Sequence, residues 1–195
     1  NSNYFSNAIV LTGGIATGKT TTANILKSHN IKIIDADKIA HILLDKYSTN
    51  ISKLFGDEFV KDNKVLRKKL GNLIFNDKIQ KKKLENFIHP LISQEILNQA
   101  KILHKTQKFY IVDIPLFFET KKYKIDKSIV VYIPKILQLQ RLMARDKSDK
   151  PSALSRIHSQ LDIEAKRKLA TYIIDNTKDI KYLQLQIQNI LKDLL

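Results

Sequence analysis

The sequence predicts an α/β fold with a five-stranded parallel sheet, on the evidence of its apolar runs and of the stretches between them. Five short runs, rich in β-branched and aromatic residues, are nearly continuous in apolar character, as strands covered on both faces are. Helix-compatible stretches separate these runs, and this alternation is typical of a parallel sheet. The predicted strands are Ala8–Thr12, Ile31–Asp35, Phe109–Ile114, Ser128–Ile133 and Tyr172–Asn176.

Three helices have clear signals in the sequence. The stretch Gly18–Ser28 directly follows the first predicted strand. Pro134, a residue type favoured at the first helical position, precedes a helical pattern of apolar residues that runs to Met143. Over Asp179–Leu195 the apolar residues recur with helical spacing, which predicts an amphipathic closing helix.

One long stretch interrupts the alternation. Residues from about Ser48 to Lys105 read as helices only, with Pro90 interrupting the last of them. Apolar spacing persists throughout, so we expect an inserted helical subdomain rather than a linker. A shorter insertion around Lys147–Pro151 reads as a polar turn between two helices.

Composition limits the classes of protein that need consideration. The 195 residues are 43% hydrophobic and 27% charged, which is ordinary globular usage for one or two domains. The lack of cysteine excludes disulfides, a thiolate nucleophile and Cys-ligated metal centres. No apolar run approaches the roughly 20 residues that cross a bilayer, and no signal segment opens the sequence. We therefore expect a soluble, cytoplasmic protein with no membrane partner.

The formal net charge of +15 suggests an anionic partner, such as nucleic acid, a membrane surface or phosphorylated small molecules. The excess is mostly lysine, and we interpret most lysines, including Lys81–Lys83, as solvated surface. Glycine and arginine are scarce and therefore more informative. Three of the five glycines fall within six positions, and three of the five arginines lie within sixteen residues.

The strongest motif is the stretch Gly-Gly-Ile-Ala-Thr-Gly-Lys-Thr at 13–20, which matches the phosphate-binding pattern G-x-x-x-x-G-K-[ST]. An apolar strand leads in and a helical stretch leads out, as the motif requires. Glycines allow successive backbone N–H groups to surround phosphate oxygens, and the helix N-terminus adds partial positive charge. Lys19 should reach the β- and γ-phosphates, and the Thr20 hydroxyl should ligate Mg²⁺. The motif predicts binding of a nucleoside triphosphate, with ATP expected.

Two carboxylates lie at the end of the second predicted strand and just after it. Ligand-binding residues lie at the carboxyl ends of the strands in such sheets, so Asp35 is expected near the γ-phosphate and its acceptor. A carboxylate there takes a proton from the attacking hydroxyl or orients it. Asp37 either contributes to the site or caps a helix beginning at Lys38.

Arg141 and Arg145 are spaced i, i+4 and share a helix face, where two like charges are unfavourable unless an anion lies beside them. We favour the interpretation that these arginines bind phosphate over the interpretation that they form a solvated basic face. Arg141 is expected to contact the migrating phosphoryl group. Asp113 closes the third predicted strand and either assists magnesium or hydrogen-bonds the loop. None of the five histidines forms a zincin pair.

Further segments, in order, resemble the dephospho-CoA kinase family. The resemblance runs from about residue 8 to about residue 190. Its motifs are Leu-Thr-Gly-Gly-Ile-x-x-Gly-Lys, Ile-Asp-Ala-Asp-x-Ile-Ala, Arg67-x-x-Leu70 with Ile74-Phe75, Ile88-His89-Pro90-Leu91-Ile92, Asp113-Ile114-Pro115-Leu116-Phe117-Phe118-Glu119, Gln138-x-x-Arg141-Leu142-x-x-Arg145, Arg156–Gln160, Lys166 and Ile174-Asp175-Asn176.

The resemblance implies a P-loop kinase of three layers with a helical substrate-binding insertion and a small mobile lid. The expected domains are a nucleotide-binding core (1–47, 106–140 and 160–195), a helical CoA domain (48–105) and a lid (141–159). The implied reaction is transfer of the ATP γ-phosphoryl group to the ribose 3′-hydroxyl of dephospho-CoA, with Mg²⁺, giving CoA and ADP. We expect a monomer, with an oligomer left open.

The residues expected to act follow from the motif and the resemblance together. Lys19, Asp35 and Arg141 are the catalytic candidates. The ATP-binding candidates are Gly13, Gly14, Ala16, Thr17, Gly18, Lys19, Thr20, Thr21 and Arg145. The candidates for binding the acceptor are Asp35, Asp37, Arg67, His89, Pro115 and Leu116, and those for binding the metal are Thr20 and Asp113.

Two positions depart from the family pattern. Ala16 stands where the family commonly has glycine, and we expect a negative φ there, because a residue with a β-carbon disfavours the left-handed region. Thr171 stands where an aspartate usually precedes the last strand, and we assign it no role. His89 with Pro90 forms a helix kink or contributes a substrate contact.

Two alternative functions fit part of the sequence. A kinase for another acceptor, such as a nucleoside monophosphate or shikimate, would share the phosphate loop and the lid arginines. A basic nucleic-acid-binding NTPase would fit the charge, but the sequence has no recognition-helix motif and no aromatic platform, so we expect no nucleic-acid partner.

Overall fold

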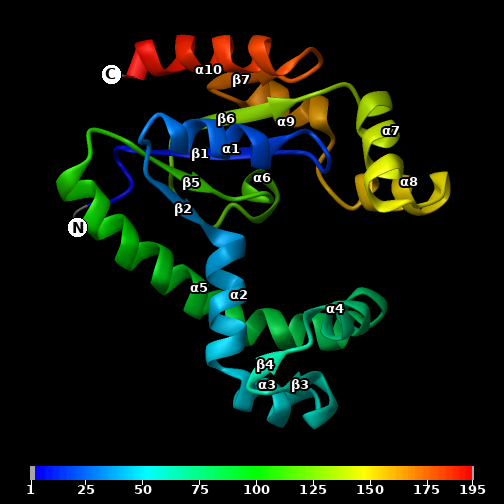
Figure 1. Ribbon diagram of the computed structural model, residues 1–195. Coiled ribbons are helices and arrows are strands. Elements are labelled where there is room, and N and C mark those ends of the chain that lie inside the picture. The colour runs from blue at the N-terminus through cyan, green and yellow to red at the C-terminus, as the bar shows by residue number, and fades with distance from the viewer. Residues whose placement is uncertain (1–2, 195) are drawn as a thin grey trace. The chain divides into compact units, whose positions relative to one another are not determined.

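The computed structural model describes residues 3–194, which divide into two compact units. The first unit comprises the residues up to Ile34 and those from Ala100 onward, and the second unit comprises Asp35–Gln99. The strands of the first unit carry its phosphate loop. Figure 1 labels the elements of both units.

The sheet has five parallel strands in the order β2-β5-β1-β6-β7. The fold class predicted from the sequence is therefore confirmed. Strand β1 pairs in parallel with β5 on one side and with β6 on the other, and β6 pairs in parallel with β7. The strands span β1 Ala8–Gly13, β2 Ile33–Asp35, β5 Tyr110–Asp113, β6 Lys127–Tyr132 and β7 Tyr172–Asp175. The three central strands are almost wholly buried, which explains their continuous apolar character.

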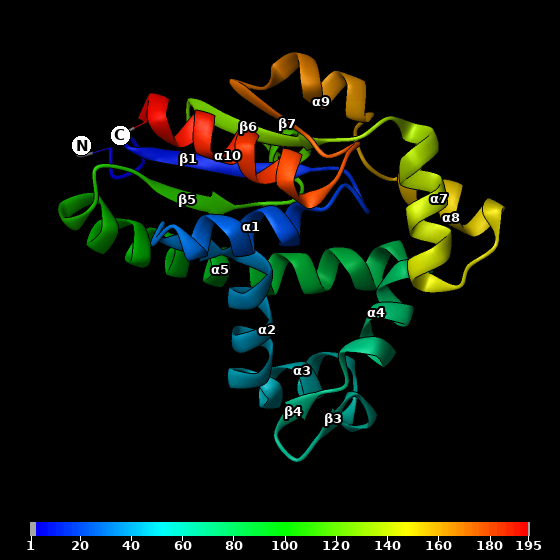
Figure 2. The same cartoon turned by 45° about the horizontal axis from the view of Figure 1, so that its top comes forward.

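Side chains that alternate along each strand pack against helices on opposite faces of this sheet. On one face, Ile9 and Leu11 of β1 share a core with Leu26 of helix α1 and Ile187 of helix α10. The opposite face is covered in part by Ile163 of helix α9, which packs on β6. Figures 1 and 2 show α1 and α10 together on one side of the sheet. These helices span α1 Lys19–Ser28, α9 Ile163–Leu169 and α10 Ile180–Leu194, so Leu195 of the predicted closing helix lies outside the described residues.

Helices α7 (Lys135–Asp146) and α8 (Lys150–His158) pack against each other in the first unit. They lie side by side in Figures 1 and 2, and Leu142, Ala153 and Ile157 form their shared core. The polar turn predicted around Lys147 is confirmed. Pro134 precedes the first residue of α7 rather than occupying it. The short helix α6 (Phe117–Thr120) follows β5.

The second unit is helical apart from one short hairpin. Its helices are α2 Ala36–Lys46, α3 Ser48–Phe55, the 3₁₀ helix Asp57–Phe59, α4 Arg67–Asn76 and most of α5 Lys78–Thr106. The expectation of helices alone is wrong here, because β3 (Val60–Lys61) pairs with β4 (Lys64–Val65) in antiparallel fashion. Asp62 and Asn63 both adopt positive φ in the turn between them. This backbone matches the twist of a tight hairpin, and it suits short polar side chains.

Helix α5 runs through Pro90 without a break, so the predicted interruption is wrong. Leu84, Ile88, Ile96 and Ala100 are buried at intervals of four or eight residues, which is a continuous helical stripe. Packing along this stripe holds the helix on both sides of the proline, which lacks only one backbone donor. Across the described residues, no helix is both long enough and apolar enough to span a membrane.

Candidate active site

The phosphate-loop motif lies between the end of β1 and the start of α1. Strand β1 ends at Gly13, and α1 begins at Lys19 with Gly18 as its N-cap. Gly18 has φ 93°, in the left-handed region, and an added β-carbon would collide with the Asn176 amide. Thr17 closes the turn, because its hydroxyl donates to the Gly14 carbonyl at 2.9 Å. Glycine is therefore required at position 18 for its conformation and for lack of space.

Ala16 also adopts positive φ, at 60°, so the expectation of a negative φ is wrong. The left-handed conformation is unfavourable for an L-residue by roughly 1–2 kcal/mol. Ile15 and Ala16 pack against the apolar core between α7 and α8. That contact compensates for the strained backbone and fixes the middle of the loop.

Side chains from outside the loop bond its carbonyls. Gln138 of α7 donates to the Ile15 carbonyl at 2.9 Å, and Asn176, just after β7, donates to the Thr17 carbonyl at 2.8 Å. In a planar trans peptide the C=O and the following N–H point in opposite directions, and the described residues contain no cis peptide. Holding these carbonyls outward therefore turns the next amides, of Ala16 and Gly18, to the other side of the chain.

The sequence reasoning assigned no role to the residues that hold the loop. Besides Gln138 and Asn176 these are Gln160, whose Oε1 accepts from the Ile15 N–H at 2.9 Å, and Lys166, whose ammonium donates to the Gly13 carbonyl at 3.1 Å. The signal that could have found Lys166 is its spacing from Ile163, which places a lysine on the buried side of α9.

Lys19 and Asp113 form an ion pair at the carboxyl end of the sheet. The Lys19 ammonium lies 2.5 Å from Asp113 Oδ1, and the two side chains are 17% and 8% exposed. Strand β5 brings Asp113 here because it lies next to β1. The motif lysine thus has an anionic partner, which is the type of group it would meet on a phosphate. Thr20 and Thr21, in the first turn of α1, are exposed.

The backbone of the loop after β5 contacts the end of β1 and the buried Lys166. The Pro115 carbonyl accepts from the Thr12 hydroxyl at 2.9 Å and from the Lys166 ammonium at 3.2 Å. Leu116 is 41% exposed. The Glu119 carboxylate pairs with Lys166 at 2.8 Å.

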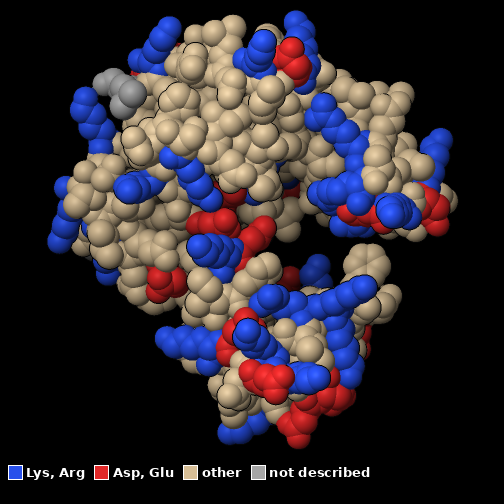
Figure 3. All heavy atoms as spheres, in the orientation of Figure 1, with Lys and Arg blue, Asp and Glu red and all other residues tan. Residues whose placement is uncertain are grey.

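The arginines of α7 and α8 have partners of two kinds. Arg141 donates to the backbone carbonyl of Asn176 at 2.9 Å, and the side chain of the same Asn176 bonds the Thr17 carbonyl. Arg145 pairs with Asp146, which also accepts from Arg156 of α8. Hydrogen bonds from Arg145, and then from Arg156, lower the pKa of the Asp146 carboxyl to about 2. The same contact raises the pKa of Arg145. Figure 3 shows blue and red side chains mixed over α7 and α8.

Asp35 is the last residue of β2 and caps helix α2. Its Oδ1 accepts from the Lys38 N–H at 2.9 Å, and the helix begins at Ala36. The alternative in which Asp37 caps a helix from Lys38 is therefore wrong. Asp37 lies exposed in the first turn of α2.

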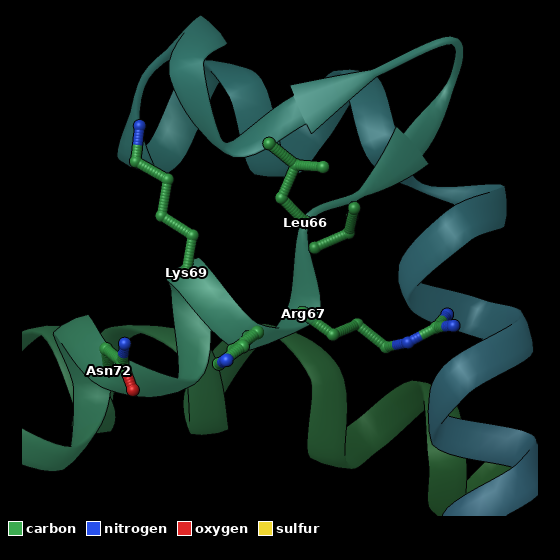
Figure 4. Close-up of a pocket in the computed structure, with 6 residues that line it drawn as sticks. Leu66, Arg67, Lys69 and Asn72 are labelled. Atoms are coloured by element: carbon green, nitrogen blue, oxygen red, sulfur yellow. The ribbon is translucent and has the colours of Figure 1, made fainter.

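Arg67 lies beside an open hollow of about 650 Å³ in the second unit. Figure 4 shows Leu66 facing this space, Lys69 extending along it and Arg67 extending toward α2. Arg67 pairs there with Asp45 at 3.0 Å while remaining 47% exposed, and Lys69 donates to the Glu58 carbonyl. The hollow combines a basic rim with apolar side chains. It is lined by Val65, Leu66, Arg67, Lys68, Lys69 and Asn72.

Two further positions, one candidate and one departure from the family pattern, lie outside these clusters. His89 is half-buried in α5. Thr171 accepts from the Ser128 N–H at 3.0 Å, so it holds the start of β6. Among the described residues, no group of three or more His, Asp or Glu could hold a metal ion by itself.

The chain is similar to known proteins over most of its length. The model of the family described as dephospho-CoA kinase matches residues 7–182. A dephospho-CoA kinase of Sulfurimonas denitrificans is 51% identical over 92% of this chain and 90% of its own length. A dephospho-CoA kinase of Helicobacter pylori strain J99 is 45% identical over 97% of this chain and 98% of its own length. The solved dephospho-CoA kinase from Campylobacter jejuni is 40% identical, with a TM-score of 0.73 over 97% of this chain and 98% of that one.

Proposed function

The chain belongs to the dephospho-CoA kinase family, and from this premise we propose that it transfers the ATP γ-phosphoryl group to the ribose 3′-hydroxyl of dephospho-CoA. The products are CoA and ADP, the last step of coenzyme A synthesis. The observation that carries the proposal is a complete phosphate loop in which Lys19 pairs with the buried carboxylate of Asp113. The chain that contains this loop matches the family over residues 7–182. Phosphoryl transfer depends mainly on positioning and charge stabilisation, and the loop supplies both.

In this proposal the triphosphate binds to the backbone amides of the loop, with contributions from Gly13, Gly14, Ala16, Thr17, Gly18, Thr20 and Thr21. The outward carbonyls of Ile15 and Thr17 support this orientation of the amides. Lys19 exchanges Asp113 for the β- and γ-phosphates. Before ATP binds, the positive charge of the Lys19 ammonium is balanced by the Asp113 carboxylate.

The acceptor side of the proposal rests on the second unit and on the loop after β5. Asp35 takes or orients the proton of the attacking hydroxyl. The basic and apolar lining of the hollow beside Arg67 suits a ligand with both phosphate and apolar parts, as dephospho-CoA has. Asp37, His89, Pro115 and Leu116 are the other proposed acceptor contacts.

Arg141 is proposed to stabilise the migrating phosphoryl group, with Arg145 on the ATP phosphates. An arginine in this role raises the rate by roughly 10³–10⁵ in related enzymes. The hydrogen bond of Arg141 to the Asn176 carbonyl supports the assignment, because Asn176 also bonds the phosphate loop. We further propose that 141–159 acts as a lid and that the helical insertion 48–105 is the CoA domain.

The oxygen donors at the loop fit a magnesium ion bound with ATP. Mg²⁺ is usually held by one or two protein oxygens, with the rest of its ligands from phosphates and water. The Thr20 hydroxyl and the Asp113 carboxylate are the proposed protein donors. When bound, the ion would neutralise charge that develops on the phosphate oxygens.

Finally, we propose a cytoplasmic monomer whose partners are small molecules. Lys and Arg lie scattered over the face seen in Figure 3, with acidic residues among them. The mixture of both charges on this face favours phosphorylated small molecules over nucleic acid.

A panel of acceptors tests the proposed function. ADP release is measured with MgATP and dephospho-CoA, AMP, CMP or shikimate, and duplex DNA is included as a separate arm. We expect kcat/KM for dephospho-CoA to exceed that of the other acceptors by at least about a hundredfold, since a site built for polar groups rejects ligands that lack them. Equal turnover of another acceptor, or ATP hydrolysis stimulated by DNA alone, would contradict the proposal.

A further inference from the structure

Lys166 has no solvent exposure, although lysine is among the residue types that are least often buried. Its ammonium has three acceptors: the Glu119 carboxylate at 2.8 Å, the Gly13 carbonyl at 3.1 Å and the Pro115 carbonyl at 3.2 Å. These acceptors match the three donors of an ammonium group. The side chain thus joins α9 to α6, to the loop after β5 and to the first residue of the phosphate motif.

Packing alone does not explain a charge at this position. Burial lowers the pKa of Lys166, which shows that the surroundings disfavour the ammonium, while Glu119 acts in the opposite direction. A buried ion pair is often no more stabilising than apolar side chains of similar volume. A methionine would fill the same space without the desolvation penalty, so the reason for a lysine lies in what its ammonium bonds.

The bond to Gly13 fixes the orientation of one peptide group. Gly13 is the last residue of β1, and a β-carbon there would lie 2.9 Å from the Val131 carbonyl oxygen, so the chain has little freedom to shift sideways. Because Lys166 holds the Gly13 carbonyl, the N–H of Gly14 points to the opposite side of the same planar peptide. Gly14 N–H is the first amide of the loop after the strand.

We propose that Lys166 is a positioning residue of the phosphate loop: held by Glu119, it bonds the Gly13 carbonyl and thereby directs the Gly14 amide toward a phosphate oxygen of ATP. This inference rests on the proposed binding of ATP at this loop. Lys166 does not touch the substrate itself. Its contribution is a loop that is already in the binding conformation before the nucleotide arrives.

The test separates loop positioning from a purely structural role. Lys166→Met removes the ammonium. Lys166→Met combined with Glu119→Gln also removes the carboxylate that would be left without its partner, while the glutamine amide keeps an oxygen for the Leu161 N–H. Lys168→Met, an exposed lysine on the same helix, is the matched control. For each variant we would measure the MgATP dissociation constant by calorimetry without acceptor, the urea midpoint, and KM for dephospho-CoA.

We expect Lys166→Met to lower the urea midpoint and the double variant to recover most of it. In both, the dissociation constant for MgATP should rise about tenfold, because a hydrogen bond from a charged group is lost. KM for dephospho-CoA should change by less than about twofold, and Lys168→Met should behave as wild type.

The proposal is overturned if the double variant regains wild-type affinity for MgATP together with its stability. It is also overturned if Lys166→Met binds MgATP as wild type does, or if both variants fail to fold, since Lys166 would then be needed for the fold itself. A wild-type protein that binds no MgATP would instead overturn the proposed function.

Discussion

Ala16 holds a backbone conformation that residues with a β-carbon rarely adopt. Its φ of 60° lies in the middle of the phosphate loop, where the sequence predicts a negative value. The prediction failed because it considered the residue alone. Contacts of Ile15 and Ala16 with the core between α7 and α8 outweigh the local preference.

Replacing Ala16 by glycine should therefore stabilise the protein. Gly has no penalty at positive φ but loses more entropy on folding, so we expect Ala16→Gly to raise the free energy of unfolding by up to about 1 kcal/mol. Ala144→Gly, at an exposed position inside α7, should lower it by about 0.5–1 kcal/mol. Urea denaturation measures both, and a destabilised Ala16→Gly would show that the positive φ carries no strain.

The strands of the sheet are predictable because the signal for each one lies within its own short run of residues. Every predicted strand is present, since continuous apolar runs of this length suit a covered parallel sheet. The β3–β4 hairpin was missed because its strands are two residues long and its Asp62-Asn63 turn lacks glycine. Pro90 was misread as a break because the signal is local, whereas the apolar stripe that holds α5 together spans both sides of it.

The candidate site was predictable only where it is contiguous in sequence. The phosphate-binding motif can be recognised from the eight consecutive residues Gly13 to Thr20. The side chains that hold the loop lie more than 120 residues away, at Gln138, Gln160, Lys166 and Asn176. Amides and lysines are common surface residues, so their residue types do not mark them as partners of a phosphate loop, although the spacing of Lys166 from Ile163 places that lysine on the buried side of α9.

The junction of α7 and α8 gives a pH-dependent prediction. The pKa of the Asp146 carboxyl is about 2 in the folded protein, whereas its usual value of 3.8 applies to the unfolded chain. A carboxyl whose folded pKa is depressed contributes stability above its unfolded pKa, and this contribution is lost as pH falls through the folded value. The loss for Asp146 should therefore lie between about pH 4 and pH 2.

Carboxyl ¹³C NMR on the protein measures this titration directly. We expect half-protonation of Asp146 near pH 2, and a higher midpoint in Arg156→Gln, which removes one of its two arginines. A wild-type midpoint near the ordinary aspartate value would mean that the two arginines do not bind this carboxylate in solution.

At the scale of the whole molecule, each compact unit carries one of the residues proposed to act in catalysis. The first unit carries Lys19 and the phosphate loop, and the second unit begins at Asp35, the proposed acceptor-side carboxylate. Asp35→Asn is an informative variant because asparagine caps helices as well as aspartate does, so the Lys38 N–H keeps an acceptor and α2 its N-cap. The variant removes a base without removing a structural bond.

The most direct test of the roles proposed for Asp35 and Lys19 compares the variants Asp35→Asn and Lys19→Ala. For each variant the MgATP dissociation constant and the turnover with dephospho-CoA are measured. We expect Asp35→Asn to bind MgATP within about twofold of wild type while turnover falls by roughly 10²–10⁴, and Lys19→Ala to lose both. Near-normal turnover in Asp35→Asn, or loss of MgATP binding by that variant, would contradict the account.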